Sequence, residues 1–109
     1  MKRLRVAVVT RFPRDPERPQ GGVEAVSVNL ARALAHLDDL AVEVVTLDPG
    51  VRSIEEQQWS GIPIFRLPRT SRGELRNALG SGRREVGRFL RELNPDIVHA
   101  HDTYGLMVK

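Results

Sequence analysis

Two adjacent glycines, Gly21 and Gly22, stand where a proline-bearing segment gives way to apolar residues at helical spacing. Backbone N–H groups at such a junction can approach a ligand closely, because glycine has no Cβ. A helix that begins there offers unpaired donors and partial positive charge, which suit a phosphate or a carboxylate. The plainer interpretation is that the glycines only make a turn, since glycine pairs are common turn residues.

Residues 11–20, which precede the glycines, contain three prolines and several charges and predict a solvated loop. This loop is long for a link between a strand and a helix, and long loops in compact domains often bind ligands. Arg11 and Arg14 lie in it and could reach an anion at Gly21 and Gly22. Each arginine could equally be a solvated surface charge.

Two histidines, His99 and His101, are two positions apart and would point to the same side of an extended strand. A metal site is one interpretation, but it needs further ligands, and the acidic residues nearby are Asp102 and Asp96. A second interpretation makes His101 a hydrogen-bonding or electrostatic residue where the strand ends. In the third, both histidines are structural.

Missing motifs exclude several classes of reaction. The sequence has no cysteine, no G-x-G-x-x-G after its first apolar run, no Walker-type Gly-Lys-Ser/Thr and no G-x-S-x-G. These absences exclude a thiol nucleophile, a dinucleotide fingerprint, P-loop phosphoryl transfer and a hydrolase nucleophile elbow. No nucleic-acid-binding module is matched either.

Short apolar runs rich in β-branched residues predict four strands, and apolar residues three and four positions apart predict two helices. The strands are expected at residues 4–10, 41–47, 62–67 and 96–101, and the helices at residues 23–37 and 74–93. Gly80-Ser81-Gly82 is expected to break the second helix. Pro63 favours an edge position for the third strand, because proline cannot donate to a ladder. Residues 51–61 have no clear pattern, and Trp59 is expected to anchor this irregular piece by packing.

The alternation of strand and helix predicts an α/β fold, with a Rossmann-like parallel sheet of strand order 3-2-1-4 flanked by helices. That order places the first and fourth strands side by side, at the switch point where ligands bind in open α/β sheets. Gly21 and Gly22 would then face His101 across a crevice at the carboxyl ends of the strands. The buried face of the first helix is expected to consist of Val23, Val26, Leu30, Ala33, Leu34 and Leu37.

At 109 residues the chain is one domain or part of one, with a formal net charge of +3. Arginines are concentrated between residues 66 and 93. The basic side of the helix at 74–93 is either a solvated face or a surface that lies against an anionic membrane, and nucleic acid is the weakest alternative. No apolar run is long enough to span a membrane, and the absence of cysteine permits a cytoplasmic location.

Taken together, these features resemble the N-terminal domain of the GT-B glycosyltransferases, in particular the family-four group of retaining enzymes. The likeness runs through nearly all 109 residues. The strings that carry it are Gly21-Gly22-Val23-Glu24, Leu30-Ala31-Arg32-Ala33-Leu34, Thr46-Leu47-Asp48-Pro49-Gly50, Gly61-Ile62-Pro63-Ile64-Phe65-Arg66-Leu67-Pro68 and Asn94-Pro95-Asp96-Ile97-Val98-His99-Ala100-His101-Asp102.

The resemblance implies transfer of a sugar from a nucleotide-sugar donor to an acceptor with retention of configuration. It implies neither a catalytic metal nor a cofactor, because the nucleotide-sugar is a substrate, and it implies no nucleic-acid partner. Gly21 and Gly22 would match the glycine loop beside the donor diphosphate and the acceptor. Beside this match, we predict Arg11 and Asp102 as further binding residues for the donor phosphate or the acceptor. His101 would match the family's active-site histidine near the transferred sugar.

Two departures from the family pattern shape the expectations. Asp38-Asp39 stands where the first helix usually ends in glycine, and aspartate tolerates the cap conformation needed there. Family members also continue into a second Rossmann-like domain, which holds the nucleotide. We therefore expect residues 1–109 to be a partial, acceptor-side N-terminal domain, a fragment without the C-terminal nucleotide-sugar domain and inactive alone.

Further expectations concern location and partners. We expect a cytoplasmic protein, with peripheral membrane contact through the arginine-rich helix at 74–93. The apolar edge at Ile97-Val98 favours self-association of the fragment. The alternative function is a stand-alone α/β module that binds an anion or a partner without catalysis.

Overall fold

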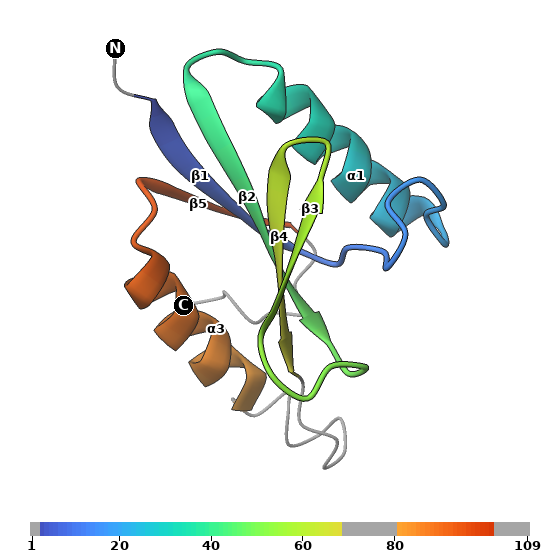
Figure 1. The fold of residues 1–109 in the computed structure, drawn as a ribbon, viewed down its shortest axis with the longest axis vertical. Helices are drawn as coiled ribbons and strands as arrows, with labels where there is room; N and C mark the ends of the chain where they lie inside the picture. Colours follow the sequence, from blue (N-terminus) through green and yellow to red (C-terminus); the bar gives the residue numbers. More distant parts are fainter. Residues whose placement is uncertain (1–2, 69–80, 102–109) are drawn as a thin grey trace.

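The computed structural model describes residues 3–68 and 81–101, in which one sheet lies between two helices (Figure 1). In chain order the elements are β1 (Leu4–Thr10), α1 (Gly22–Ala35), β2 (Leu40–Asp48), β3 (Glu55–Trp59), β4 (Ile62–Pro68), α3 (Ser81–Leu93) and β5 (Ile97–His101). The fold is α/β and Rossmann-like, as the sequence predicts.

The sheet has five strands in the order β3-β4-β2-β1-β5. Three neighbouring pairs are parallel, and β3 runs antiparallel to β4. The parallel strands bring their last residues, Thr10, Asp48, Pro68 and His101, to one end of the sheet. We call this end the carboxyl edge, and it is where ligands bind in open α/β sheets.

The predicted strand order 3-2-1-4 is wrong for this sheet, because β3 adds a fifth strand outside the strand predicted at 62–67. β3 comes from residues 51–61, for which the sequence predicts an irregular segment. Its sequence, Glu55-Glu56-Gln57-Gln58-Trp59, lacks the apolar alternation by which strands are recognised. The overlooked signal is Ser60-Gly61, whose φ angles of 53° and 80° are typical of a two-residue hairpin turn.

The predicted edge position of the strand that contains Pro63 is also wrong. β4 lies between β3 and β2, and its pairing with β2 begins at Ile64, opposite Val44. Pro63 stands before that first pair and faces Gln58 on the β3 side. The missing N–H of Pro63 therefore leaves the parallel ladder intact, which is why proline is tolerated at the start of an inner strand.

Two apolar clusters pack against opposite faces of the sheet, one beneath each helix (Figure 1). The buried members on the α1 face are Val6, Val8, Phe12, Val28, Ala31, Val42, Val44, Ile62 and Ile64. Those on the α3 face are Ala7, Val9, Val45, Leu67, Val86 and Leu90. Alternate residues of β1 and β2 thus supply opposite faces, as expected of strands covered on both sides.

The predicted buried face of α1 is partly wrong. Val26 and Leu37 are 51% and 52% exposed, whereas Ser27, Val28 and Ala31 are buried. The small side chains at positions 27 and 31 let the helix approach the sheet closely. The polar Ser27 is accommodated because its hydroxyl has hydrogen-bond partners, described below.

Both helices end where the sequence predicts a stop, within two residues. The N–H of His36, the residue after α1, donates to the carbonyl oxygen of Ala33 at 3.2 Å. After α3, Asn94 has a φ of 53° and its N–H donates to the carbonyl oxygen of Leu90 at 2.8 Å. The described part of this helix is α3, from Ser81, and the expected break at residues 80–82 stays a prediction. The predicted helical residues 74–80 lie outside the described residues.

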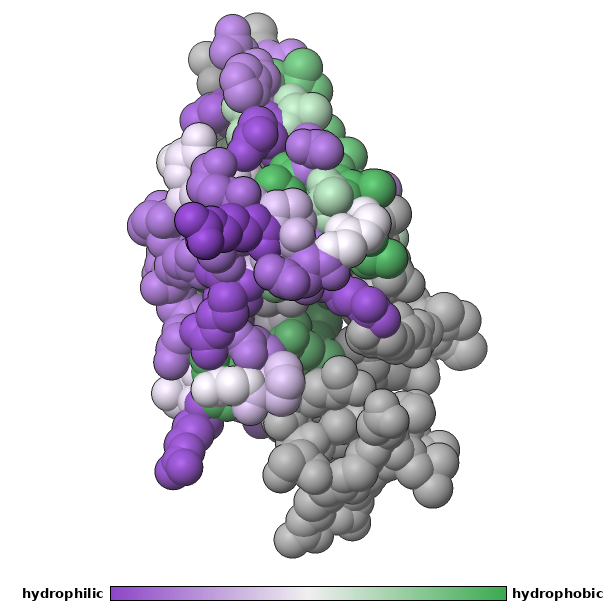
Figure 2. All heavy atoms as spheres, turned by 90° about the vertical axis from the view of Figure 1, so that its right-hand side faces the viewer, coloured by the Kyte–Doolittle hydropathy of each residue, from purple (hydrophilic) through white to green (hydrophobic). Residues whose placement is uncertain are grey.

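Figure 2 shows the side of the molecule on which α1 and residues 11–20 lie. Hydrophilic residues cover most of its described surface, and hydrophobic residues gather along one margin. Within residues 3–68 and 81–101, neither helix has the length and apolar character that crossing a bilayer requires.

The surface of β5 leads to a prediction about self-association. Among the described residues, β5 pairs with β1 alone, and its Ile97 and Val98 are 45% and 42% exposed. We expect the 109-residue chain to self-associate through this strand, because unpaired strand edges with apolar side chains template pairing. Light scattering over a wide concentration range should show a mass that rises with concentration.

Matched variants test where the association occurs. Replacing Val98→Lys should reduce the association, because a charged edge disfavours strand pairing. Val26→Lys, at a similarly exposed apolar position on α1, should leave it unchanged. A monomeric wild-type chain at every concentration contradicts the prediction.

Candidate functional site

The glycine pair forms the start of α1. Gly21 is the residue before the helix, with φ 128° and ψ 177°, a conformation that side-chain-bearing residues rarely adopt. Its carbonyl oxygen accepts the first helical hydrogen bond, from the N–H of Ala25 at 3.0 Å. A Cβ built on Gly21 or Gly22 would meet no atom within 4 Å. Gly21 is therefore required by backbone conformation, and the space beside both glycines is open.

The carboxylate of Glu24 binds the backbone of Gln20, the residue before this turn. Its Oε1 accepts a hydrogen bond from the N–H of Gln20 at 2.7 Å, which fixes the entry of the loop into the helix. No side chain caps the helix at Gly21. The first N–H groups of a helix have no partners within the helix, so they are available to an anion in this turn.

A buried pair of hydroxyls fastens the beginning of α1 to the end of β1. The side-chain oxygens of Thr10 and Ser27 lie 2.6 Å apart, and Ser27 also donates to the carbonyl oxygen of Val23 at 3.0 Å. Thr10 is 4% and Ser27 0% exposed, so this contact is shielded from water. The first turns of α1, which follow the glycines, are thereby tied to the last residue of β1.

The predicted histidines lie on the neighbouring strand. In the register of β1 with β5, His99 is opposite Val8 and His101 is opposite Thr10, so His101 ends its strand beside the strand end that holds α1. Arg11 follows Thr10 at the same edge. The first and fourth predicted strands are therefore adjacent, as expected. Asp102 lies outside the described residues, and a crevice between Gly21 and His101 stays a prediction.

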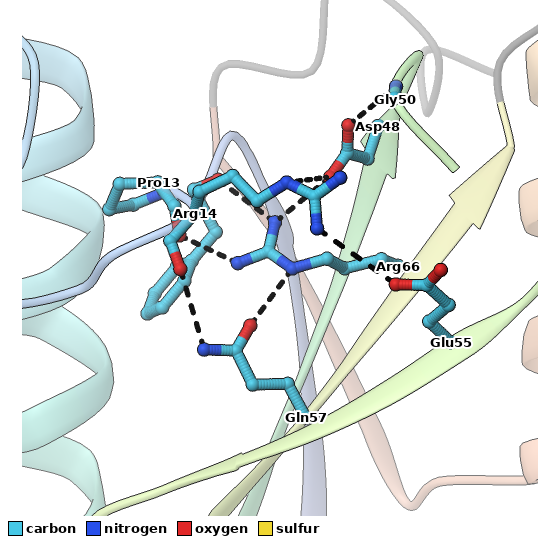
Figure 3. A network of polar contacts seen from close by, with 8 residues as sticks. Pro13, Arg14, Asp48, Gly50, Glu55, Gln57 and Arg66 are labelled. Atoms are coloured by element: carbon cyan, nitrogen blue, oxygen red, sulfur yellow. Dashed lines mark hydrogen bonds and ion pairs between the residues drawn. The ribbon is translucent and has the colours of Figure 1, made fainter.

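A second group of residues at the carboxyl edge surrounds Arg66 of β4 (Figure 3). The side chain of Arg66 is 2% exposed. Its Nη2 donates to the carbonyl oxygen of Pro13 at 2.6 Å, and its Nη1 donates to that of Phe12 at 3.4 Å. Its Nε donates to Oε1 of Gln57 on β3 at 2.9 Å. Arg66 thus binds the backbone of residues 11–20 to the sheet.

The charge of Arg66 is balanced by Asp48 at the end of β2. Nη1 of Arg66 lies 3.5 Å from Oδ2 of Asp48, and Nε of Arg14 lies 3.4 Å from the same oxygen. The other oxygen, Oδ1, accepts a hydrogen bond from the N–H of Gly50 at 2.8 Å. Burial lowers the pKa of Arg66 from its ordinary value and Asp48 opposes that shift, so the guanidinium remains a cation.

The described side-chain contacts of Arg14 are with carboxylates of the sheet. Besides its contact with Asp48, its Nη1 lies 3.9 Å from Oε1 of Glu55. Its side chain is thus engaged with the last residue of β2 and the first residue of β3. A role for Arg14 as a ligand of an anion at the glycine turn stays a prediction.

Other candidate sites in the described residues are limited. A hollow of about 150 Å³ is lined by Ile54, Leu67, Pro68, Arg88, Phe89 and Glu92. It lies against α3, on the face of the sheet opposite α1. No group of three or more histidine, aspartate or glutamate residues is arranged for a metal within residues 3–68 and 81–101.

Comparison with known proteins places these features in a family. The family model described as Glycosyltransferase Family 4 matches residues 20–109, which is most of the chain. The chain belongs to glycosyltransferase family 4. No curated protein sequence and no solved structure matches it. The match begins just before the glycine turn, so the family 4 region contains Gly21, Gly22 and the strand that ends in His101.

Several residues that organise the carboxyl edge carry little or no signal in the sequence. Arg66 lies in a strand without obvious chemistry, although an arginine among Ile64, Phe65 and Leu67 is itself a signal, because a buried cation needs partners. Thr10 and Ser27 give no such signal. A threonine at a strand end and a serine in a helix are common, and their contact arises only in the folded chain.

The conformation of Gly21 leads to a prediction with a built-in control. Gly21→Ala should lower the free energy of unfolding by about 1–3 kcal/mol, because alanine is strained at this φ and ψ. Gly22→Ala has the same open space and lies in the helix, so it should be neutral or slightly stabilising. Urea unfolding measures both. Equal effects of the two substitutions would contradict the assigned conformation.

Burial of Arg66 leads to a second prediction. Arg66→Met should destabilise the chain by about 3 kcal/mol, because Asp48 and two loop carbonyl groups lose a buried charged donor. Arg52→Met, at an exposed arginine, is the control and should change stability by less than about 0.5 kcal/mol. Chemical denaturation again provides the measurement. A small effect of Arg66→Met would show that the loop carbonyl groups find other donors.

Proposed function

We propose that this chain is the acceptor-side, N-terminal part of a retaining GT-B glycosyltransferase, which transfers a sugar from a nucleotide-sugar donor to an acceptor. In this reaction the bond between the sugar and the donor diphosphate breaks and a bond to an acceptor oxygen forms. The acceptor oxygen loses its proton, and the nucleoside diphosphate leaves with the electron pair of the broken bond. Membership of glycosyltransferase family 4 supports this class of reaction.

One structural observation carries the proposal: Thr10 joins the start of α1 to the strand beside His101. The Thr10 hydroxyl contacts Ser27 of α1 at 2.6 Å, and Thr10 is paired in register with His101 of β5. Both contacts support the proposal that the glycine turn and His101 act at one end of the sheet. A reacting group placed there would have backbone donors on one side and a histidine position on the other.

The proposed roles follow from charge and backbone geometry. Negative charge develops on the donor diphosphate as it leaves, and preorganised N–H groups at Gly21 and Gly22 stabilise such charge. Arg11, directly after β1, adds a positive charge at the same edge. His101 would lie near the transferred sugar, and Asp102 would contribute to binding. The N-terminal domain would also position the acceptor, which lowers the entropic part of the barrier.

The proposal extends to partners and location. The nucleotide would be held by a second domain, no metal or cofactor is needed, and residues 1–109 alone would be inactive. We place the protein in the cytoplasm. The exposed Arg88 and Arg91 of α3 are in keeping with peripheral contact of the helix at 74–93 with an anionic membrane surface.

The decisive experiment starts from the coding DNA that follows the codon for Lys109. The protein encoded by the complete reading frame should release nucleoside diphosphate from a nucleotide-sugar in the presence of an acceptor. In that protein His101→Ala should lower kcat by about a hundredfold or more, as loss of a group at the reacting centre does. His36→Ala, at the exposed end of α1, should leave kcat unchanged.

A stop codon directly after Lys109 would overturn the enzymatic proposal, and so would equal kcat values for the two histidine variants. The stand-alone anion-binding module is the function that would then remain. It predicts that the 109-residue chain binds an anion at Gly21 and Gly22 without any transfer of sugar.

A further inference from the structure

The side chains on one face of β3 all contact the loop of residues 11–20. Glu55, Gln57 and Trp59 alternate along the strand and so share a face. Each reaches the loop: Glu55 through Arg14 at 3.9 Å, Gln57 through the carbonyl oxygen of Arg14 at 3.4 Å, and Trp59 through Glu17 at 2.9 Å. β3 is difficult to recognise in the sequence because it is polar, and its polar side chains contact the polar loop of residues 11–20.

The opposite face of β3 has no such contacts among the described residues. Glu56 and Gln58 are exposed there, and Nε2 of Gln58 donates to Oε2 of Glu56 at 2.7 Å. The two faces of β3 therefore differ in what they touch, because one contacts the loop and the other is exposed. Gln58 consequently offers a control position close to the loop-facing residues.

Trp59 makes the most elaborate of these contacts. Its indole N–H donates to Oε2 of Glu17, and its ring meets the edge of Phe12 with centroids 5.9 Å apart. The guanidinium of Arg32, on α1, lies 5.1 Å from the centroid of the Trp59 ring and 3.9 Å from Oε2 of Glu17. Glu17 is thus placed between the helix and β3, and the loop is held from both sides.

We propose that β3 is a positioning strand, whose side chains at Gln57 and Trp59 hold residues 11–20 in the one conformation that presents Gly21 and Gly22 at the carboxyl edge. Arg66 fixes the first part of the loop, at Phe12 and Pro13, and Trp59 fixes its middle, at Glu17. Gln57 serves both, because its amide accepts from Arg66 and donates to Arg14.

This arrangement has a consequence for binding at the glycine turn. Ordering a loop of ten residues costs conformational entropy. When the loop is already ordered in the free protein, this entropy loss does not reduce the free energy of ligand binding. The three prolines already restrict the loop, and β3 removes much of the remaining freedom. The inference rests on the proposed function only in that the ligand is taken to carry a diphosphate.

Limited digestion of the 109-residue chain with trypsin tests the positioning role without any ligand. Cleavage after Arg14 reports opening of the loop, because proteolysis tracks the population of the locally opened chain. Cleavage after the exposed Arg52 serves as the internal reference. Mass spectrometry gives the initial rates of both cleavages, and their ratio is the measured quantity.

Trp59→Phe keeps an aromatic ring beside Phe12 and removes the donor to Glu17. It should raise the ratio about fivefold, because the loop loses a hydrogen bond to a charged acceptor. Gln58→Ala, on the opposite face of β3, should leave the ratio unchanged. Two substitutions of Glu17 separate the effect of the hydrogen bond from that of the charge. Glu17→Ala removes the acceptor and should raise the ratio. Glu17→Gln keeps an acceptor oxygen without the charge, and its ratio should stay near that of wild type.

An unchanged ratio for Trp59→Phe and Glu17→Ala overturns the inference. The inference also fails if Trp59→Phe raises both cleavage rates equally, since that marks global destabilisation and not opening of the loop. Titration calorimetry with inorganic pyrophosphate then distinguishes this failure from failure of the proposed function. A changed ratio in a chain that does not bind pyrophosphate supports the positioning strand and counts against the diphosphate site. Equal pyrophosphate binding by wild type and Trp59→Phe, together with an unchanged cleavage ratio, supports the diphosphate site and counts against the positioning strand.

Discussion

A buried guanidinium is the constraint on which the carboxyl edge of this protein depends. Arg66 is 2% exposed, so its donors must be satisfied by protein atoms. Those atoms come from separate parts of the chain: the carbonyl groups of residues 12 and 13, the carboxylate of Asp48 and the amide of Gln57. A hydrophobic contact would tolerate many arrangements of this loop, whereas a cation with fixed donor directions accepts few.

The buried polar residues gather at one end of the sheet, whereas the apolar clusters cover its two faces. The apolar clusters fill the space beneath both helices, where valines predominate. The buried polar residues of the described chain are Thr10, Ser27, Thr46, Asp48 and Arg66, which lie at or near the carboxyl edge. The apolar part supplies the driving force for folding, and the polar part selects the loop conformation from those that the core alone would permit.

The sequence predicts the features that depend on the spacing of apolar residues and on the glycines and prolines that end helices and strands. The four parallel strands, the helix α1 and the end of α3 at Leu93 follow from residue patterns and agree with the structure. The resemblance at the glycine turn points to the family that the comparison identifies. The apolar pattern does not reveal β3, because four of its five residues are polar or charged. The contacts that Arg66 and Trp59 make with the loop of residues 11–20 are equally hidden, since they join residues more than forty positions apart.

The hairpin turn at Ser60-Gly61 acquires importance from these contacts, although it is remote from the glycine turn in sequence. A two-residue connection fixes the register of β3 on β4, with Trp59 opposite Ile62. A shift of this register by one residue would exchange the two faces of β3 and bring Glu56 and Gln58 toward the loop in place of Gln57 and Trp59. The length of one tight turn thus decides which side chains meet residues 11–20. Insertions there would leave the parallel sheet intact while altering the loop that enters the glycine turn, which makes this hairpin a place where related sequences can diverge in loop geometry without losing the fold.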